Sequence, residues 1–503
     1  MVAANGYRQI LRSTIIIGGA SILSVVLGLV RTKVAAVLLG PSGVGLIGLF
    51  QNLIATASSI ASLGFGNVGT RQIAEAAGRE DALAVAAARR ALCWGTLALA
   101  LVGMFAFWGL RTVLAEWVLG DVTAAASVGW LALGIALTVA AGSQSALLNG
   151  LHRIGDIARV SVLSALLSTV LGVGVLLTWG EGGVLAFVLS APLCTFFFGH
   201  LYVARLPPVL APTTPRAVLF GQLTTLARLG VAFMLAGLVA TLTQLLVRTL
   251  VQRQLGIEAS GNFQASWQIS MTYLGFVLSA MGTDYYPRLT AAIHDHIVAN
   301  RLVNEQTEAA LLLGGGVLLA MLGLAPWVID RLYSADFFAA AEVLRWQILG
   351  DLLKVVSWPL GFVLLASGNG RAFLIAESVA FGTFAVLTWL TLPWFNVNAT
   401  GIAFFGMYIV YLPFVYWLAK RRTNFQWTSS VWWHASTLFA VCVVIKLAAG
   451  WSQFWGAGLG VIGSLIWFAY AVGRLSRMGL LGKKINTLYS KFSGRVRSDK
   501  TKS

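Results

Sequence analysis

The chain is poor in charge, and poorest in negative charge. Of its 503 residues only 11% are charged, with 18 Asp and Glu in all, whereas 58% are hydrophobic. Soluble domains carry about 25% charged residues. Continuous apolar runs of about 20 residues, long enough to cross a bilayer, recur along the chain, and the mean hydropathy is +0.81. Because these runs do not alternate with polar residues as barrel strands do, the composition predicts an all-α polytopic membrane protein.

Other scarcities exclude whole classes of chemistry. Three cysteines, Cys93, Cys194 and Cys442, lie inside apolar runs, so no disulfide framework is expected. The sequence has no Walker-type phosphate loop, which argues against an ATPase. The pattern "HDH" at His294–His296 has no further ligand pattern, so no metal or other cofactor is expected. The connections between apolar runs are too short for a soluble catalytic domain, and we therefore expect a protein that is not an enzyme.

The apolar runs and their breaks predict fourteen transmembrane helices. The second run begins after the turn signal Gly40-Pro41, and the others end at similar polar or glycine-containing breaks. The predicted spans are 13–38, 43–66, 91–115, 125–149, 157–179, 183–204, 227–252, 262–283, 309–329, 342–366, 373–393, 399–419, 430–449 and 453–473.

The excess of positive charge predicts the orientation of these spans. The net charge is +17, and in membrane proteins of the inner membrane such charge gathers in cytoplasmic loops, so it does not require nucleic acid as a partner. With the N-terminus in the cytoplasm, most of the 35 Lys and Arg fall on the cytoplasmic side. The sequence thus predicts a multi-pass bacterial inner-membrane protein with both termini cytoplasmic.

An internal repeat predicts two parallel lobes. "LVRT" at Leu29–Thr32 recurs at Leu246–Thr249, and at a nearly constant spacing "LNGLHR", ending at Arg153, matches "ASGNGR", ending at Arg371. Parallel repeats of six spans are typical of transporters that bind their substrate in a central cavity between two lobes. The predicted divisions are an N-terminal lobe at 1–206, a cytoplasmic linker at 207–217, a C-terminal lobe at 218–420, two extra helices at 421–473 and a basic cytoplasmic tail at 474–503.

Four cations lie inside predicted spans, where each costs about 2.5–3.5 kcal/mol on insertion scales. Arg31 and Arg248 are equivalent in the two repeats, and Lys33 and Lys354 are further candidates. We expect them to line the cavity and bind an anionic substrate, because the planar guanidinium suits phosphate. Two alternatives remain: the long side chains could extend to the membrane surface, or they could pair with carboxylates.

Carboxylates are few within the predicted spans, and Asp351 and Glu377 stand out. A buried acid of this kind can bind a coupling proton or sodium ion, or it can balance a nearby cation. Lys354 follows Asp351 by one helical turn, so these two side chains could neutralise each other.

The segment "LVRTKVAAVLLGPSGVGLIGLFQNLIATASSIASLGFGNVGTRQIAEA" resembles the first two helices of Wzx-type O-antigen and exopolysaccharide flippases. These proteins belong to the multidrug/oligosaccharidyl-lipid/polysaccharide (MOP) exporter superfamily. The resemblance implies two six-helix lobes around a cavity, and transfer of undecaprenyl-diphosphate-linked oligosaccharide repeat units between leaflets by alternating access without ATP. By similarity to the lipid II flippases, Arg31 takes the role of a diphosphate-contacting cation.

The family usually has about twelve spans, whereas lipid II flippases have fourteen and a lipid-lined groove made by the extra pair. The leading hypothesis is therefore polysaccharide export for lipopolysaccharide or exopolysaccharide biosynthesis, with membrane lipids and a polymerase/chain-length complex as further partners. A lipid II-type flippase and a multidrug/cation antiporter of the same superfamily are the alternatives. An antiporter would need acids rather than arginines in its cavity.

Overall fold

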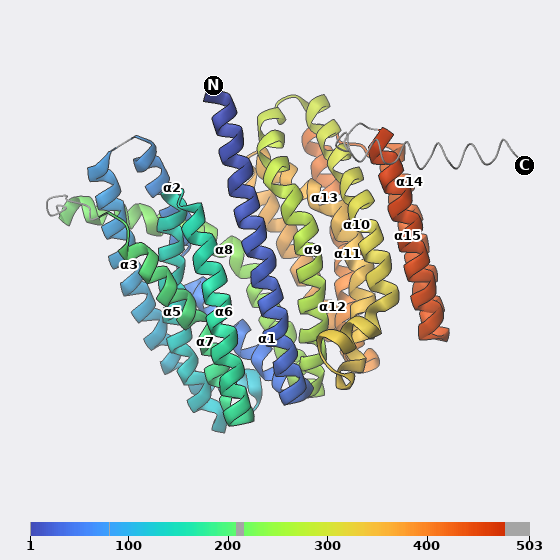
Figure 1. The fold of residues 1–503 in the computed structure, drawn as a ribbon, viewed down its shortest axis with the longest axis horizontal. Helices are drawn as coiled ribbons and strands as arrows, with labels where there is room; N and C mark the ends of the chain where they lie inside the picture. Colours follow the sequence, from blue (N-terminus) through green and yellow to red (C-terminus); the bar gives the residue numbers. More distant parts are fainter. Residues whose placement is uncertain (1, 80, 208–215, 478–503) are drawn as a thin grey trace, which may run out of the picture. The chain divides into compact units, whose positions relative to one another are not determined.

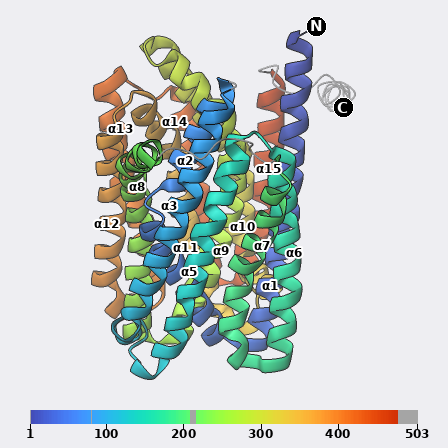
Figure 2. The same ribbon diagram turned by 90° about the vertical axis from the view of Figure 1, so that its left-hand side faces the viewer.

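A computed structural model describes residues 2–79, 81–207 and 216–477, which form helices joined by short turns and contain no strand (Figures 1 and 2). A helix satisfies its own backbone hydrogen bonds, which is the requirement for a chain that crosses lipid. The predicted all-α membrane fold is confirmed. The α-helices are α1 Val2–Ala61, α2 Phe65–Gly78, α3 Ala82–Gly109, α4 Arg111–Leu114, α5 Ala125–Gly150, α6 Ile154–Trp179, α7 Val184–Ala204, α8 Arg216–Leu255, α9 Ile257–Ala292, α10 His296–Leu332, α11 Phe338–Ala366, α12 Gly370–Phe395, α13 Asn398–Thr423, α14 Ser429–Trp451 and α15 Gln453–Arg477.

The described residues contain ten stretches that are long and apolar enough to span a membrane. Two of these, Gly18–Ala61 with 44 residues and Ile154–Ala204 with 51, are each about twice the length that one crossing needs. Several helices extend beyond the predicted spans: α10 begins at His296 rather than at residue 309. Hydropathy marks only the part of a helix inside hydrocarbon, so polar ends escape it. The count of fourteen spans remains a prediction.

Helix α1 is interrupted at the predicted Gly40-Pro41 break. Gly40 has φ 61° and ψ −166°, a conformation that favours glycine. Pro41 follows it and has no backbone N–H to continue the helical hydrogen bonds. The 60 residues of α1 are therefore two helical segments joined by a kink. Arg31 lies in the first segment, about two turns before the break.

A second interruption, between α1 and α2, was predicted only as the end of a span. Leu63 and Gly64 have φ 45° and 67°, and α2 then continues to Gly78. Helix α8 passes against this turn at Gly230: a Cβ added there would meet the backbone at Leu63 and Gly64. Small residues allow such close backbone approach between membrane helices.

The chain forms two compact units. Unit 1 contains residues 1–265, 330–338 and 388–397, and unit 2 contains residues 266–329, 339–387 and 398–503. The predicted division into two lobes, a linker, two extra helices and a tail remains a prediction. Residues 208–215 of the predicted linker and 478–503 of the predicted tail lie outside the described residues.

Within unit 2, α14 and α15 pack on α10. A Cβ added at Gly323 of α10 would lie 2.6 Å from the Gly456 carbonyl oxygen and 2.8 Å from the Gly460 Cα, both in α15. The backbones are therefore in direct contact there. Nearer the other end of the pair, Glu308 of α10 accepts hydrogen bonds from Ser430 of α14 at 2.8 Å and from Arg474 of α15 at 3.3 Å. The extra helices are thus an integral part of unit 2.

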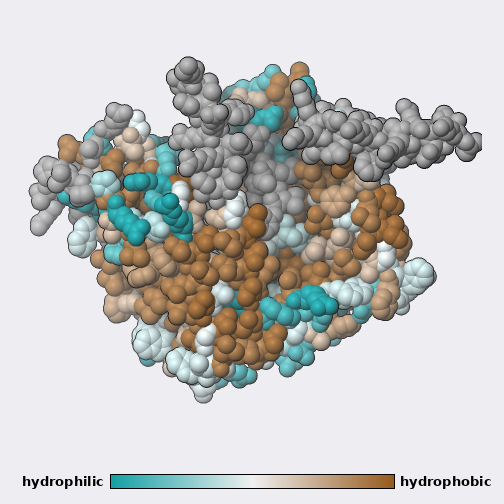
Figure 3. Space-filling view, viewed as in Figure 1, coloured by the Kyte–Doolittle hydropathy of each residue, from teal (hydrophilic) through white to brown (hydrophobic). Residues whose placement is uncertain are grey.

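Hydrophobic residues cover much of the described surface seen in Figure 3. Large apolar side chains are among the exposed ones; Val102 of α3, for example, is 66% exposed and Trp451 of α14 is 93% exposed. Such a surface is unfavourable in water but favourable against acyl chains. The chain is a multi-pass membrane protein.

Candidate functional site

A cavity of about 430 Å³ lies within unit 1, among α1, α5, α6 and α7. Its wall is unusual for a membrane helix bundle because it is rich in hydroxyl groups. The hydroxyl residues are Ser24, Ser145, Ser161, Ser164, Ser168, Thr169 and Thr195. Several of these side chains bond to neighbouring helices; the Thr169 hydroxyl, for example, donates to the Leu27 carbonyl at 3.3 Å. Their oxygens offer polar partners to a ligand inside the membrane.

Arg31 is the cation of this cavity. On α1 it lies on the same face as Ser24 and Gly28, at the helical spacing that brings all three to the cavity. Its Nη2 group donates to the Phe187 carbonyl and, at 3.1 Å, to the Ser190 hydroxyl. Its Cζ atom also lies 4.2 Å from the centre of the Phe187 ring, a cation–π contact.

These contacts leave part of the guanidinium free. Arg31 Nε is buried and has no hydrogen-bond partner, and the hydrogen bonds to Phe187 and Ser190 both use Nη2. A buried donor without a partner is costly. Since α7 fixes one corner of the group through Phe187, the remaining donors are available to an anion in the cavity. Whether the cavity or the membrane surface receives this side chain during transport remains a prediction.

Arg248, on α8, has a separate set of contacts in unit 1. It is only 4% exposed, its Nη1 donates to the Gln264 side chain of α9, and its Cζ lies 5.3 Å from the Phe263 ring centre. Gly48 of α1 faces the same pair, because a Cβ added there would lie 3.0 Å from Arg248 Nη1. Its Nε is also buried without a partner. Neither Arg31 nor Arg248 forms an ion pair within the described residues.

Lys33 lies at the end of another helix. Its Nζ donates to the carbonyls of Asp330, at 3.1 Å, and Tyr333, at the C-terminus of α10. Arg253 likewise donates to a backbone carbonyl of a helix: its Nη1 lies 2.7 Å from the Glu116 carbonyl oxygen of the short π-helix η1 (Ala115–Leu119). The C-terminus of a helix carries partial negative charge, so both cations are placed where the backbone stabilises them.

Unit 2 contains a second polar cluster, built around Asp351. This residue of α11 is completely buried, and its Oδ2 accepts hydrogen bonds from Tyr273 and, at 2.7 Å, from Ser270, both on α9. Its other oxygen, Oδ1, is buried without a partner. A buried carboxylate oxygen needs a donor or a cation, so this atom marks a place where a proton or small cation would be stabilised.

The structure brings Lys354 and Glu377 into the same cluster. Lys354 of α11 interacts electrostatically with both Asp351 and Glu377, although its Nζ makes only a 3.6 Å contact with the Met271 sulfur. Glu377 of α12 accepts a 3.0 Å hydrogen bond from Tyr411 of α13. Among the described residues no ion pair joins Lys354 to Asp351, and neutralisation of one by the other remains a prediction.

Gln347 is a member of this face of α11 that sequence reasoning missed. It precedes Asp351 by one turn and is completely buried, and neither its amide oxygen nor its amide nitrogen has a hydrogen-bond partner. Neutral amides are not marked by charge, so only its spacing from Asp351 could have indicated it. The described residues contain no group of three or more His, Cys, Asp or Glu placed to hold a metal ion.

Comparison with solved structures defines the class. The chain is similar to a multidrug resistance MATE family transporter of the MOP superfamily in its inward-facing conformation, with TM-score 0.67 and 16% identity, covering 80% of this chain and 94% of that one. It is equally similar to the lipid II flippase MurJ in an inward closed conformation, with TM-score 0.67 and 13% identity over 92% and 99% of the two chains. The fold is that of the MOP superfamily.

Sequence comparison then gives the family. Residues 10–292 match the model of the family described as "Polysaccharide biosynthesis protein", and the chain belongs to this family. It is 26% identical over 418 residues to the "Lipid III flippase" of Escherichia coli (strain K12), covering 78% of this chain and 95% of that protein. The protein of the same description from Shigella flexneri matches to the same extent. The expected membership in this transporter superfamily is confirmed.

Proposed function

We propose that the chain flips an undecaprenyl-diphosphate-linked oligosaccharide repeat unit across the bacterial inner membrane, for O-antigen or exopolysaccharide assembly. The observation that carries the proposal is Arg31, whose unpaired donors lie on a hydroxyl-lined cavity inside the membrane. A diphosphate needs charge-assisted donors, and a glycan needs hydroxyl partners. The family described as polysaccharide biosynthesis proteins and the similarity to a lipid III flippase support the same substrate class.

Under this proposal Arg31 donates to the diphosphate in its cavity. Arg248, which does not line that cavity, binds the diphosphate at another point of the path, where Lys33 and Lys354 contribute further positive charge. The fixed Nη2 corner of Arg31 leaves its fork preorganised, so little side-chain entropy is lost when phosphate binds. Alternating access would carry the head group between leaflets while the polyprenyl tail stays in lipid. Both termini would be cytoplasmic, and a polymerase/chain-length complex would receive the product.

The energy would come from an ion gradient or the membrane potential. Asp351, with its unpaired Oδ1, and Glu377 are the proposed coupling residues. This cluster is also the observation that favours the second candidate, a multidrug/cation antiporter, since buried acids bind cations. The two candidates differ in substrate: one is an anionic glycolipid and the other a cationic drug.

The decisive experiment is a flipping assay in proteoliposomes that contain a polyprenyl-diphosphate oligosaccharide. We expect Arg31→Ala to slow flipping about 10- to 100-fold, because a hydrogen bond to a charged group contributes about 1.5–3 kcal/mol and about 1.4 kcal/mol is a factor of ten. Arg31→Lys should be intermediate, since it keeps the charge but loses the fork. The matched control is Arg71→Ala, which removes an exposed arginine paired with Glu75.

A normal flipping rate for folded Arg31→Ala would overturn the diphosphate-binding role. Efflux of a cationic drug by the wild-type chain, together with no movement of glycolipid, would instead establish the antiporter.

A further inference from the structure

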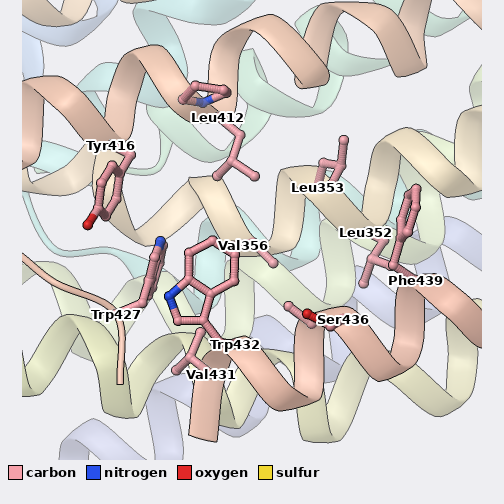
Figure 4. Close-up of a pocket in the computed structure, with 12 residues that line it drawn as sticks. Leu352, Leu353, Val356, Leu412, Tyr416, Trp427, Val431, Trp432, Ser436 and Phe439 are labelled. Carbon is pink, nitrogen blue, oxygen red and sulfur yellow. The ribbon is translucent and has the colours of Figure 1, made fainter. Parts of the chain in front are cut away.

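A second cavity of about 430 Å³ forms a groove on unit 2 between α11, α13 and α14 (Figure 4). Its lining is almost entirely apolar, in contrast to the cavity at Arg31. The lining residues are Leu352, Leu353, Val356, Leu412, Pro413, Tyr416, Trp427, Val431, Trp432, Ala435, Ser436 and Phe439. An open apolar groove on a membrane helix bundle has the chemistry of an acyl-chain site.

The groove has two different ends. Figure 4 shows Tyr416, Trp427 and Trp432 together at one end, with Leu352 and Phe439 toward the other. The rings of Tyr416 and Trp427 are stacked, 6.3 Å apart and 17° from parallel. Tryptophan and tyrosine favour the boundary between head groups and hydrocarbon. The aromatic end, with Tyr416 and the two tryptophans, is therefore the head-group end, and the end with Leu352 and Phe439 lies deeper in the bilayer.

Three cations stand beside the aromatic end. Lys420, Arg421 and Arg422 form the last turn of α13, one turn beyond Tyr416, and all three are exposed. Arg421 lies over the Trp417 ring, with its Cζ 4.0 Å from the ring centre. Among the described residues none of the three forms an ion pair. Basic clusters at the end of a transmembrane helix attract anionic head groups.

From this arrangement we infer that the groove is a binding site for an anionic phospholipid, with one acyl chain between α11, α13 and α14 and the phosphate at Lys420–Arg422. Acyl chains are as apolar as the groove, so burial against lipid contributes little selectivity. Selectivity must come from the head group. A phospholipid fits better than the glycolipid substrate, because the cations lie on an exposed rim and the groove has almost no polar wall for sugars.

Two properties can be tested separately: the cations should determine which head group is preferred, and the groove should determine how much lipid is bound. Detergent-purified, delipidated full-length chain would be titrated with phosphatidylglycerol and with zwitterionic phosphatidylethanolamine, and bound lipid counted by native mass spectrometry. We expect the wild-type chain to bind phosphatidylglycerol at least tenfold more tightly. Lys420→Gln/Arg421→Gln/Arg422→Gln should abolish this preference. Ala435→Trp, which fills the groove, should reduce binding of both lipids.

Two control variants match these changes. Ala440→Trp adds the same ring to an exposed position of α14 that is not part of the groove, and it should bind lipid normally. Arg71→Gln/Arg79→Gln/Arg301→Gln removes three exposed arginines from other helices, and it should keep the preference for phosphatidylglycerol.

The inference is wrong if the first triple variant keeps its preference, or if the second loses it equally, since overall charge would then explain binding. It is also wrong if a polyprenyl diphosphate displaces phosphatidylglycerol and is itself blocked by Ala435→Trp, because the groove would then belong to the substrate. The flipping assay with Arg31→Ala is independent of these results, so failure of either proposal can be recognised separately.

Discussion

Gly261→Ala should separate two helices that now touch through their backbones. Gly261, in the first turns of α9, packs on the Gly40-Pro41 break of α1. A Cβ added to it would overlap the Pro41 carbonyl oxygen and lie 2.6 Å from the Pro41 carbonyl carbon. Carbon atoms prefer separations of about 3.5–4.0 Å, and the oxygen is nearer still, so α9 must move by more than about 1 Å. The obstacle is backbone, which cannot rotate away as a side chain could.

The expected cost is about 1–3 kcal/mol, the range for overpacking, offset by up to about 1 kcal/mol because alanine is the better helix former. Gly174→Ala in α6 is the matched control, since nothing lies within 4 Å of a Cβ added there. The difference between the two variants cancels the helix-propensity term. Thermal unfolding in nanodiscs, followed by tryptophan fluorescence, should give Gly261→Ala the lower midpoint. Equal midpoints would refute the close helix contact.

Three further experiments test other parts of the structure. Gly48→Ala should lower stability and slow flipping, because its Cβ would lie 2.7 Å from the buried Gln264 oxygen that accepts from Arg248 and displacing it leaves a buried donor without a partner; a normal rate would remove Arg248 from the path. Asp351→Asn should keep the fold, since an amide oxygen still accepts from Ser270, but transport should no longer respond to an imposed ion gradient; an unchanged response would exclude Asp351 from coupling. Glu308→Ala and Arg474→Ala should each destabilise the chain by about 1 kcal/mol, and a double-mutant cycle should show coupling; strictly additive losses would mean that the pair contributes nothing.

The general fold could be predicted from the sequence because hydropathy marks the segments that insert into a membrane. Apolar runs locate helices whatever their neighbours, and the break at Gly40-Pro41 was visible because proline and glycine act on the local backbone. The turn at Leu63–Gly64 was not found as an interruption between two helices, because a leucine with positive φ leaves no signal in composition. The helix ends were missed for a different reason: polar residues continue a helix beyond the hydrocarbon, where hydropathy no longer marks it.

The candidate site was only partly predictable. Charge within apolar runs identified Arg31, Arg248 and Asp351, since buried charge is costly and rarely accidental. The partners of these residues could not be found this way. The Phe187 carbonyl that holds Arg31 is backbone, and Gln347 beside Asp351 carries no charge. Such contacts depend on how helices distant in sequence pack, which a single sequence does not encode in any local pattern.

The glycines that join α10 to α15 restrict how this chain can be shortened. Gly323, Gly456 and Gly460 meet backbone to backbone, and Gly315 and Gly316 of α10 face Trp467 and Phe468 of α15. In a chain that ends at residue 452, α15 would be absent and the glycines of α10 would face an empty groove. Because glycine has no side chain, lipid tails would have to fill that groove. Helix α15 therefore fills the space that larger side chains on α10 would otherwise fill, and a version of this protein without α15 would need larger residues at those positions.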